Sequence, residues 1–284
     1  LGFVCHNHQT WRARWWRMRV LLLLLLAGLA GCVDSGDPAD PAAVDADGDG
    51  FTDEEEAAAG TDPTNATSVP MAVSAEQWPQ WAEAPGALLQ PGDPIGWCTF
   101  NFLFEGPNNT GYIGTAAHCT EGEGERVPLE GFGDIGTVVF DSGDHTDGVD
   151  FTLIQLDADV VGLAHPKMRN HDGPTGAVTA ADLAVGDIVE LHGYGTVLGE
   201  SEVTRDRFGV LVAFDEREYT INMPALPGDS GSSLLHQETG KALGIISRFG
   251  TDQTPPSTDR GPLMPYIFEA LEAAGYGDVR LATI

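Results

Sequence analysis

Residues 93–284 are predicted to fold as an all-β structure, and three observations support this class. Apolar and β-branched residues gather in many short runs. Glycine, asparagine, aspartate and proline separate these runs, as in residues 106–111 (GPNNTG). A helical pattern is evident only near the C-terminus. Many short strands with turn residues between them are typical of β-sandwiches and β-barrels.

The candidate strands follow one another along this part of the chain. They cover residues 98–104, 112–116, 137–140, 151–156, 188–192, 208–214, 219–223, 233–236 and 242–246. Residues 265–274 carry Tyr266, Ile267, Ala270 and Leu271 at helical spacing, which predicts a helix. The chain of 284 residues has the length for one or two domains with a large core.

Residues 1–31 are predicted to be an export signal, with Met18 as the true start. A positive end (RMR), an apolar run (VLLLLLL) and a closing LAGC follow one another up to Cys32. The apolar run is too short for a comfortable membrane span. LAGC resembles a bacterial lipoprotein signal, which implies a lipid on Cys32 and attachment at the cell envelope. The alternative is an ordinary cleaved signal on a secreted protein.

Residues 32–92 are predicted to be a mostly disordered acidic tether, because Ala, Asp, Pro and Gly dominate them. The whole chain has 14 Lys+Arg against 43 Asp+Glu and a formal net charge of −29. Such a charge disfavours nucleic acid and anionic lipid as partners, and it favours cation binding. The chain is expected to be a monomer.

One segment of the tether, residues 45–56, has the spacing of a calcium-binding loop. Calcium takes about six to eight oxygen ligands around a sharp turn, and a glycine lies at the sixth loop position. The expected ligands are Asp45, Asp47, Asp49, the Phe51 carbonyl, Asp53 and bidentate Glu56. With GTDP following, the segment looks like the thrombospondin type 3 repeats of bacterial surface proteins. The alternative is a solvated acidic linker. No cofactor is expected for catalysis.

Three segments together indicate hydrolytic chemistry. Residues 115–119 (TAAHC) contain His118, residues 147–154 (DGVDFTLI) lead an acid into an apolar strand, and residues 226–232 (LPGDSGS) contain Ser230. A serine is a weak nucleophile unless a base, here the histidine, takes its proton. Each motif alone is more often a turn or a packed core residue, so the evidence lies in their combination. The competing acids are Asp144, Asp147, Asp150 and Asp157.

In this order, the motifs resemble those of the trypsin-like serine proteases of the chymotrypsin fold. HGYG at residues 192–195 and LGIIS at residues 243–247 resemble two further strand motifs of that family. The resemblance covers residues 93–284. It implies two six-stranded antiparallel β-barrels, joined near residues 170–175, with a C-terminal helix and the site between the barrels. It also implies an exported endopeptidase that cleaves proteins or peptides through an acyl-enzyme.

The same resemblance assigns roles to residues of this chain. Ser230 is the nucleophile, His118 the general base, and Asp150, which an apolar strand follows directly, the acid that orients His118. The N–H groups of Gly228 and Ser230 form the oxyanion hole. A disulfide joins Cys119, beside the histidine, to Cys98 on the preceding strand.

The resemblance also places Pro224, Ser247 and Arg248 in the primary specificity pocket. A proline at position 224 offers no carboxylate, which disfavours cleavage after arginine or lysine. Small or apolar side chains are expected before the cut, or acidic ones if Arg248 faces the pocket.

The chain departs from the family's sequence pattern at two places, and these departures limit which family properties can be expected of it. Gly231-Ser232-Ser233 replaces the Gly-Gly-Pro of eukaryotic members, and no Ile-Val-Gly-Gly activation sequence precedes the first strand. In zymogen-type members of the family the new N-terminus pairs with the acid next to the serine, here Asp229, so the partner of Asp229 stays open in this chain. The alternative function is a catalytically silent protease-fold binding module on the cell surface. An esterase is disfavoured by the order of the motifs.

Overall fold

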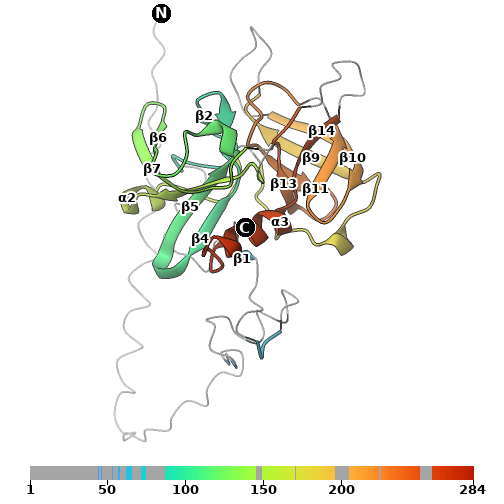
Figure 1. Ribbon diagram of the computed structural model, residues 1–284, viewed down its shortest axis with the longest axis horizontal. Helices are drawn as coiled ribbons and strands as arrows, with labels where there is room; N and C mark the ends of the chain where they lie inside the picture. Colours follow the sequence, from blue (N-terminus) through green and yellow to red (C-terminus); the bar gives the residue numbers. More distant parts are fainter. Residues whose placement is uncertain are drawn as a thin grey trace, which may run out of the picture. The chain divides into compact units, whose positions relative to one another are not determined.

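Two large, mostly antiparallel β-sheets and a C-terminal helix form most of the folded part of the chain (Figure 1). The computed structural model describes residues 87–144, 149–169, 171–195, 205–223, 225–249 and 258–284. It also describes residues 44, 46, 53, 57, 62–65 and 72–74. The signal segment and Cys32 lie outside the described residues.

The first sheet has seven strands and draws on both ends of the folded part. Its order is β1 (Ala72–Ser74), β15 (Arg280–Thr283), β4 (Leu103–Gly106), β5 (Thr110–Thr115), β8 (Thr152–Leu156), β7 (Gly133–Asp141) and β6 (Arg126–Leu129). Only the β1–β15 pair is parallel. A short hairpin of β2 (Pro94–Ile95) and β3 (Cys98–Thr99) precedes β4.

The second sheet has six strands, all antiparallel. Its order is β13 (Lys241–Ile245), β12 (Ser233–His236), β9 (Ile188–Gly193), β10 (Arg205–Phe214), β11 (Glu218–Asn222) and β14 (Thr258–Pro262). Single bridges from Gly244 to Leu263 and from Arg248 to Arg260 connect the two edges, so the sheet closes into a barrel.

Each sheet has its own apolar core. Phe100, Leu103, Ile113 and Ile154 are fully buried in the first. In the second core, Val189, Leu191, Leu211, Tyr219 and Ile221 are also fully buried. In the second core, Val189 and Leu191 alternate along β9 and Tyr219 and Ile221 along β11, as a strand with one buried face requires.

A third cluster joins the two barrels. It contains Phe104 and Phe151 from the first, Leu235 and Ile245 from the second, and residues of helix α3 (Met264–Ala273). In α3, Met264, Ile267 and Leu271 are buried at helical spacing. The barrels are therefore packed against each other, which gives residues of the two barrels fixed relative positions.

The predicted class, the two barrels and the helix are confirmed. The structure also contains β1, β2, β6, β14 and β15, which the sequence did not predict. Strand β15 returns the chain to the first sheet after α3, and this sheet has seven strands instead of the six expected. Residues 87–92, placed in the tether from the sequence, pack with the first barrel, where Ala87 and Leu89 are buried. The connection between the barrels includes the short helices α2 (Ala158–Val161) and η5 (Ala180–Asp182).

Candidate active site

His118 lies in the single turn η4 (Ala117–Cys119), which follows strand β5. Its ring nitrogen Nδ1 is 3.0 Å from Asp150 Oδ1 and 2.9 Å from Asp150 Oδ2. Its backbone N–H donates to the same carboxylate at 3.0 Å. Because a carboxylate accepts, Nδ1 carries the proton, and Nε2 is left as the basic nitrogen.

Asp150 is fully buried just before strand β8, and its backbone has a φ of +56°. A positive φ is uncommon for a residue other than glycine and here places the carboxylate against His118. Ser247 donates its hydroxyl to Asp150 Oδ2 at 2.5 Å. Of the competing acids, Asp157 pairs with Arg126 on the surface and Asp144 is exposed, while Asp147 is outside the described residues.

The hydrogen bond to Asp150 raises the pKa of His118, and burial of the ring works in the opposite direction. The negative charges of Asp150 and Asp144 add to the rise. The imidazolium is therefore favoured relative to a free histidine. This is the arrangement that a general base needs, since the base must hold a proton during the reaction.

Ser230 lies on the turn that leads into strand β12, close to His118. Cys119, next to His118, has its sulfur 3.9 Å from the Ser230 carbonyl oxygen, and the Thr99 N–H donates to that oxygen at 2.8 Å. Gly231 has a φ of +85°, and an added Cβ would lie 2.4 Å from Thr115 Oγ1. Only glycine permits the turn to approach the His118 segment so closely.

Among the contacts of the described residues there is no hydrogen bond between Ser230 Oγ and His118 Nε2. In unliganded sites such bonds are often long and shorten when substrate binds. The N–H groups of Gly228 and Ser230 likewise have no hydrogen-bond partner within the described residues, and Gly228 has a φ of +103°. Two adjacent free N–H donors beside a serine are what an oxyanion hole requires.

Asp229, between these two donors, is fully buried, and its partner is Arg207 of strand β10. Arg207 donates to Asp229 Oδ1, as does the N–H of Gly195 at 2.8 Å. The Leu226 N–H donates to Oδ2 at 2.6 Å. Burial raises the pKa of Asp229, and Arg207 opposes the rise. The buried Asp229 is therefore paired with a cation from within the chain.

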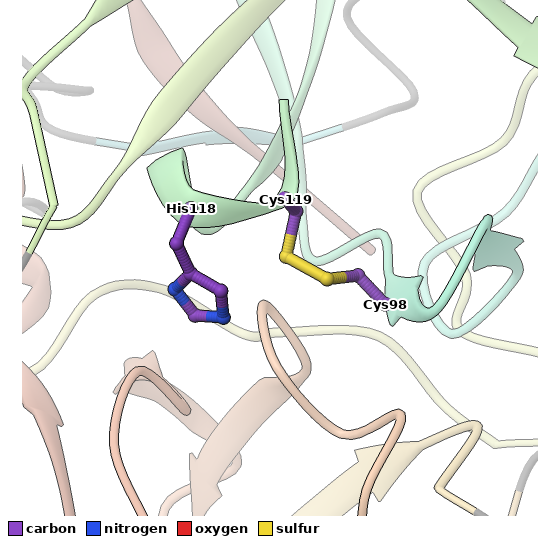
Figure 2. A group of neighbouring side chains, drawn as sticks. All are labelled: Cys98, His118 and Cys119. Atoms are coloured by element: carbon purple, nitrogen blue, oxygen red, sulfur yellow. A yellow bond between two sulfur atoms is a disulfide. The ribbon is translucent and has the colours of Figure 1, made fainter. Parts of the chain in front are cut away.

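Cys98 and Cys119 form a disulfide with a Cα–Cα distance of 6.1 Å. Figure 2 shows the bond leaving the same turn as the His118 ring. Closing a loop of 21 residues stabilises a protein by about 3 kcal/mol in the chain-entropy model. Donor atoms of these two cysteines and His118 lie within 4.8 Å of one another, but both sulfurs are in the disulfide and unavailable as thiolates.

The residues assigned to the specificity pocket have different surroundings. Ser247 is buried and its hydroxyl is engaged by Asp150. Arg248 forms an ion pair with Glu218 of strand β11, so its charge is already neutralised. Pro224 lies outside the described residues.

Of the six expected calcium ligands, the structure describes Asp53 alone. Asp53 Oδ1 accepts a hydrogen bond from the Ala46 N–H at 2.9 Å, and the Asp53 N–H donates to the Val44 carbonyl. Asp45, Asp47, Asp49, Phe51 and Glu56 are outside the described residues.

Two contributions to the site were not predicted from the sequence. Arg207 is one of several arginines in the chain, and only the pairing of β9 with β10 places it behind Asp229. Thr99 links the two barrels: its hydroxyl donates to the Gly228 carbonyl at 2.7 Å and accepts from the Tyr194 N–H at 3.1 Å. In the sequence, the one feature that could have indicated this role of Thr99 is its position directly after Cys98.

Solved structures similar to this one are serine proteases. Thermobifida fusca Protease A is 20% identical, with a TM-score of 0.50, and the match covers 69% of this chain and 100% of that protein. Nocardiopsis Protease (NAPase) is 18% identical, with a TM-score of 0.50 and the same coverage. Cellulomonas bogoriensis chymotrypsin is 20% identical, with a TM-score of 0.47. At these identities the comparison shows that the fold is the chymotrypsin fold.

Residues 45–66 match the bacterial TSP3 repeat family. No curated protein matches the chain. In the part of the chain that the structure describes, no helix combines the length and apolar character needed to cross a bilayer.

Proposed function

We propose that this protein is an exported serine endopeptidase. The observation that carries the proposal is the contact between Asp150 and His118, beside the turn that holds Ser230. Asp150 is fully buried, and both of its carboxylate oxygens are within hydrogen-bond distance of His118 Nδ1. A buried charge is costly unless it is paired, so such an arrangement is retained where an imidazolium must be stabilised. The chymotrypsin fold supports the same reaction class.

In the proposed mechanism, Ser230 Oγ attacks the carbonyl carbon of a peptide bond while His118 Nε2 takes the hydroxyl proton. The developing oxyanion accepts hydrogen bonds from the N–H groups of Gly228 and Ser230, each donor contributing about 3 kcal/mol in the transition state. His118 then gives its proton to the leaving amine. Water, activated by the same nitrogen, hydrolyses the acyl-enzyme and regenerates Ser230.

The proposed mechanism is tested by the pH dependence of Ser230 labelling. A fluorophosphonate should label Ser230 at a rate that rises with pH, because only neutral His118 can take the proton. Since Asp150 raises the pKa of His118, the midpoint should lie above about 6.5, the usual value for histidine. Asp150 stabilises the protonated ring of His118 in the folded protein. The resulting contribution to the free energy of unfolding is therefore fully present at pH values below the pKa of histidine in the unfolded chain. It is lost as pH rises through the folded pKa.

The labelling rate is measured from about pH 5 to about pH 9, within the range where histidine titrates. Replacing the buried His236, which pairs with Asp187 and Thr239 away from this site, serves as the control and should leave the midpoint unchanged. Absence of labelling over this range would favour a silent binding module instead.

We also propose that residues 45–56 bind calcium. The match to the TSP3 repeat and the Asp53–Ala46 hydrogen bond support this. Calcium titrated into the chain from residue 33 onward should give a saturable heat, which Asp49→Ala and Glu56→Ala should remove. Glu55→Ala, at a loop position that supplies no ligand, should keep it. A wild-type protein that gives no heat at millimolar calcium would leave the segment a plain acidic linker.

Finally, we propose that lipid on Cys32 holds the protein at the cell envelope. The LAGC sequence supports the proposal, and the acidic composition offers no other attraction to anionic membranes. Cys32→Ser should transfer the protein from the membrane fraction to the soluble fraction. Ser35→Ala, three positions after Cys32, is the control and should leave the membrane association unchanged. Equal membrane association of the Cys32→Ser protein would argue against the anchor.

A further inference from the structure

Four polar side chains gather on the outer face of the second barrel. We call His171, Glu190, His192 and Asp206 the β9–β10 cluster. Glu190 and His192 are two residues apart on β9, and Asp206 of β10 pairs directly with His192. Their neighbours Val189 and Leu191 enter the barrel core, so the cluster occupies the opposite face.

His171 comes from the connection between the barrels, and its protonation can be worked out from its contacts. Its Nδ1 is 2.7 Å from the Asp172 carbonyl oxygen, which can only accept, so Nδ1 carries a proton. Its Nε2 is 3.1 Å from Glu190 Oε1. If His171 is neutral, its Nε2 carries a lone pair that faces the lone pairs of Glu190 Oε1. A cation or a second proton must then lie between Nε2 and Oε1.

His192 is in contact with Asp206. Its Nδ1 donates to Asp206 Oδ1, and only 1% of its side chain is exposed. The second nitrogen, Nε2, is buried and makes no hydrogen bond of normal geometry with the described residues. An imidazole that donates to a carboxylate orients that carboxylate, as partners of metal ligands commonly do.

Donor atoms of His171, Glu190 and Asp206 all lie within 4.8 Å of one another. Around a tetrahedral zinc ion, with bonds of about 2.0–2.2 Å, ligand atoms are about 3.3–3.6 Å apart. Small rotations of the three side chains would bring their donor atoms from the present separations to those around a zinc ion. Glu190 is mostly buried, whereas Asp206 has 36% of its side chain exposed, so an ion can enter from solvent.

We propose that His171 Nε2, Glu190 and Asp206 bind a divalent transition-metal ion of the zinc type, with His192 holding Asp206 in place. One imidazole nitrogen and two carboxylate oxygens are ligands that zinc accepts, with water in the fourth position. Calcium, which takes oxygen ligands only, is a poorer match for a site with an imidazole. The two carboxylates balance the charge of the ion.

The position of the site indicates a structural role. His171 belongs to the connection between the barrels, whereas Glu190 and Asp206 lie on adjacent strands (Figure 1). An ion bound there fastens this connection to β9 and β10. Asp206 also directly precedes Arg207, the residue that neutralises Asp229.

The test uses the chain from residue 33 onward, stripped with a chelator and kept in excess calcium so that the acidic loop is occupied. Zinc titrated into the wild-type protein should bind at one saturable site in the barrel and raise the melting temperature. His171→Ala and Glu190→Gln should each weaken this binding by at least about 100-fold and remove the zinc-dependent rise.

Asp172→Asn is the matched control, because Asp172 is adjacent in sequence, exposed, and paired with Lys167 instead. It should bind zinc as the wild type does. The melting temperatures without metal show whether each variant is folded. If wild type and both ligand variants bind zinc equally, or if none binds it, His171 and Glu190 form an ordinary ion pair and the metal site is refuted. This outcome does not depend on whether the protein hydrolyses peptides.

Discussion

Ser230→Ala should reduce hydrolysis of casein to background and abolish labelling by a fluorophosphonate. Loss of the nucleophile in a triad of this kind lowers the rate by about 10⁴-fold or more, because the remaining residues act as a unit with it. The variant should keep the melting temperature of the wild type, since the substitution removes a single hydroxyl on a turn.

Ser233→Ala is the matched control for this experiment. Ser233 begins strand β12, three positions after Ser230, and its hydroxyl is buried without a hydrogen-bond partner among the described residues. Removing it should leave both hydrolysis and labelling intact. If Ser230→Ala digests casein as fast as the wild type, Ser230 is not the nucleophile.

Arg207→Met should destabilise the protein by about 3–5 kcal/mol, since it leaves Asp229 as a buried charge without its counter-charge. The side chains of both residues are largely buried, so water screens this interaction weakly. Hydrolysis should fall as well, because Asp229 lies between Gly228 and Ser230, whose N–H groups we propose as the oxyanion hole. Urea denaturation measures the first effect and fluorophosphonate labelling the second.

The variant should also respond differently to pH. Burial already raises the pKa of Asp229, and removal of Arg207 raises it further. A carboxyl group with a raised pKa in the folded state favours folding when protonated, so the variant should gain stability relative to the wild type as pH falls. Adding Asp229→Asn should restore part of the stability without restoring activity.

Arg126→Met provides the comparison for a surface pair. Arg126 bonds Asp157 with both side chains well exposed, and such pairs contribute about 0–1 kcal/mol. If Arg207→Met lowers the free energy of unfolding no more than Arg126→Met does, the Arg207–Asp229 ion pair does not stabilise the turn that contains Ser230.

Short local motifs were sufficient to predict the disulfide and to name candidate catalytic residues. His118 and Ser230 lie in short motifs, and the predicted Cys98–Cys119 disulfide is present. Asp150 was harder to assign, because several aspartates precede the same apolar strand and only the contact with His118 distinguishes it.

Residues that act through pairing between distant strands could not be predicted in this way. Strand β14 has the sequence TDRGP, which has no strand-forming composition, and it forms a strand because β11 lies beside it. Arg207 and the β9–β10 cluster depend on the register of β9 with β10. That register is determined by the packing of the whole barrel, which a local pattern does not reveal.

The last strand, β15, has a consequence for how the protein acquires its structure. It lies between β1 and β4, so the sheet that begins near residue 72 is completed only by residues 280–283, about 200 residues later along the chain. Contacts between residues so far apart form slowly, because a long loop must close first. During synthesis, the first barrel is therefore incomplete until residues 280–283 have emerged. Until then Leu281 and Ala282 cannot fill their buried places, and a truncated product has no complete first barrel on which to arrange His118 and Asp150.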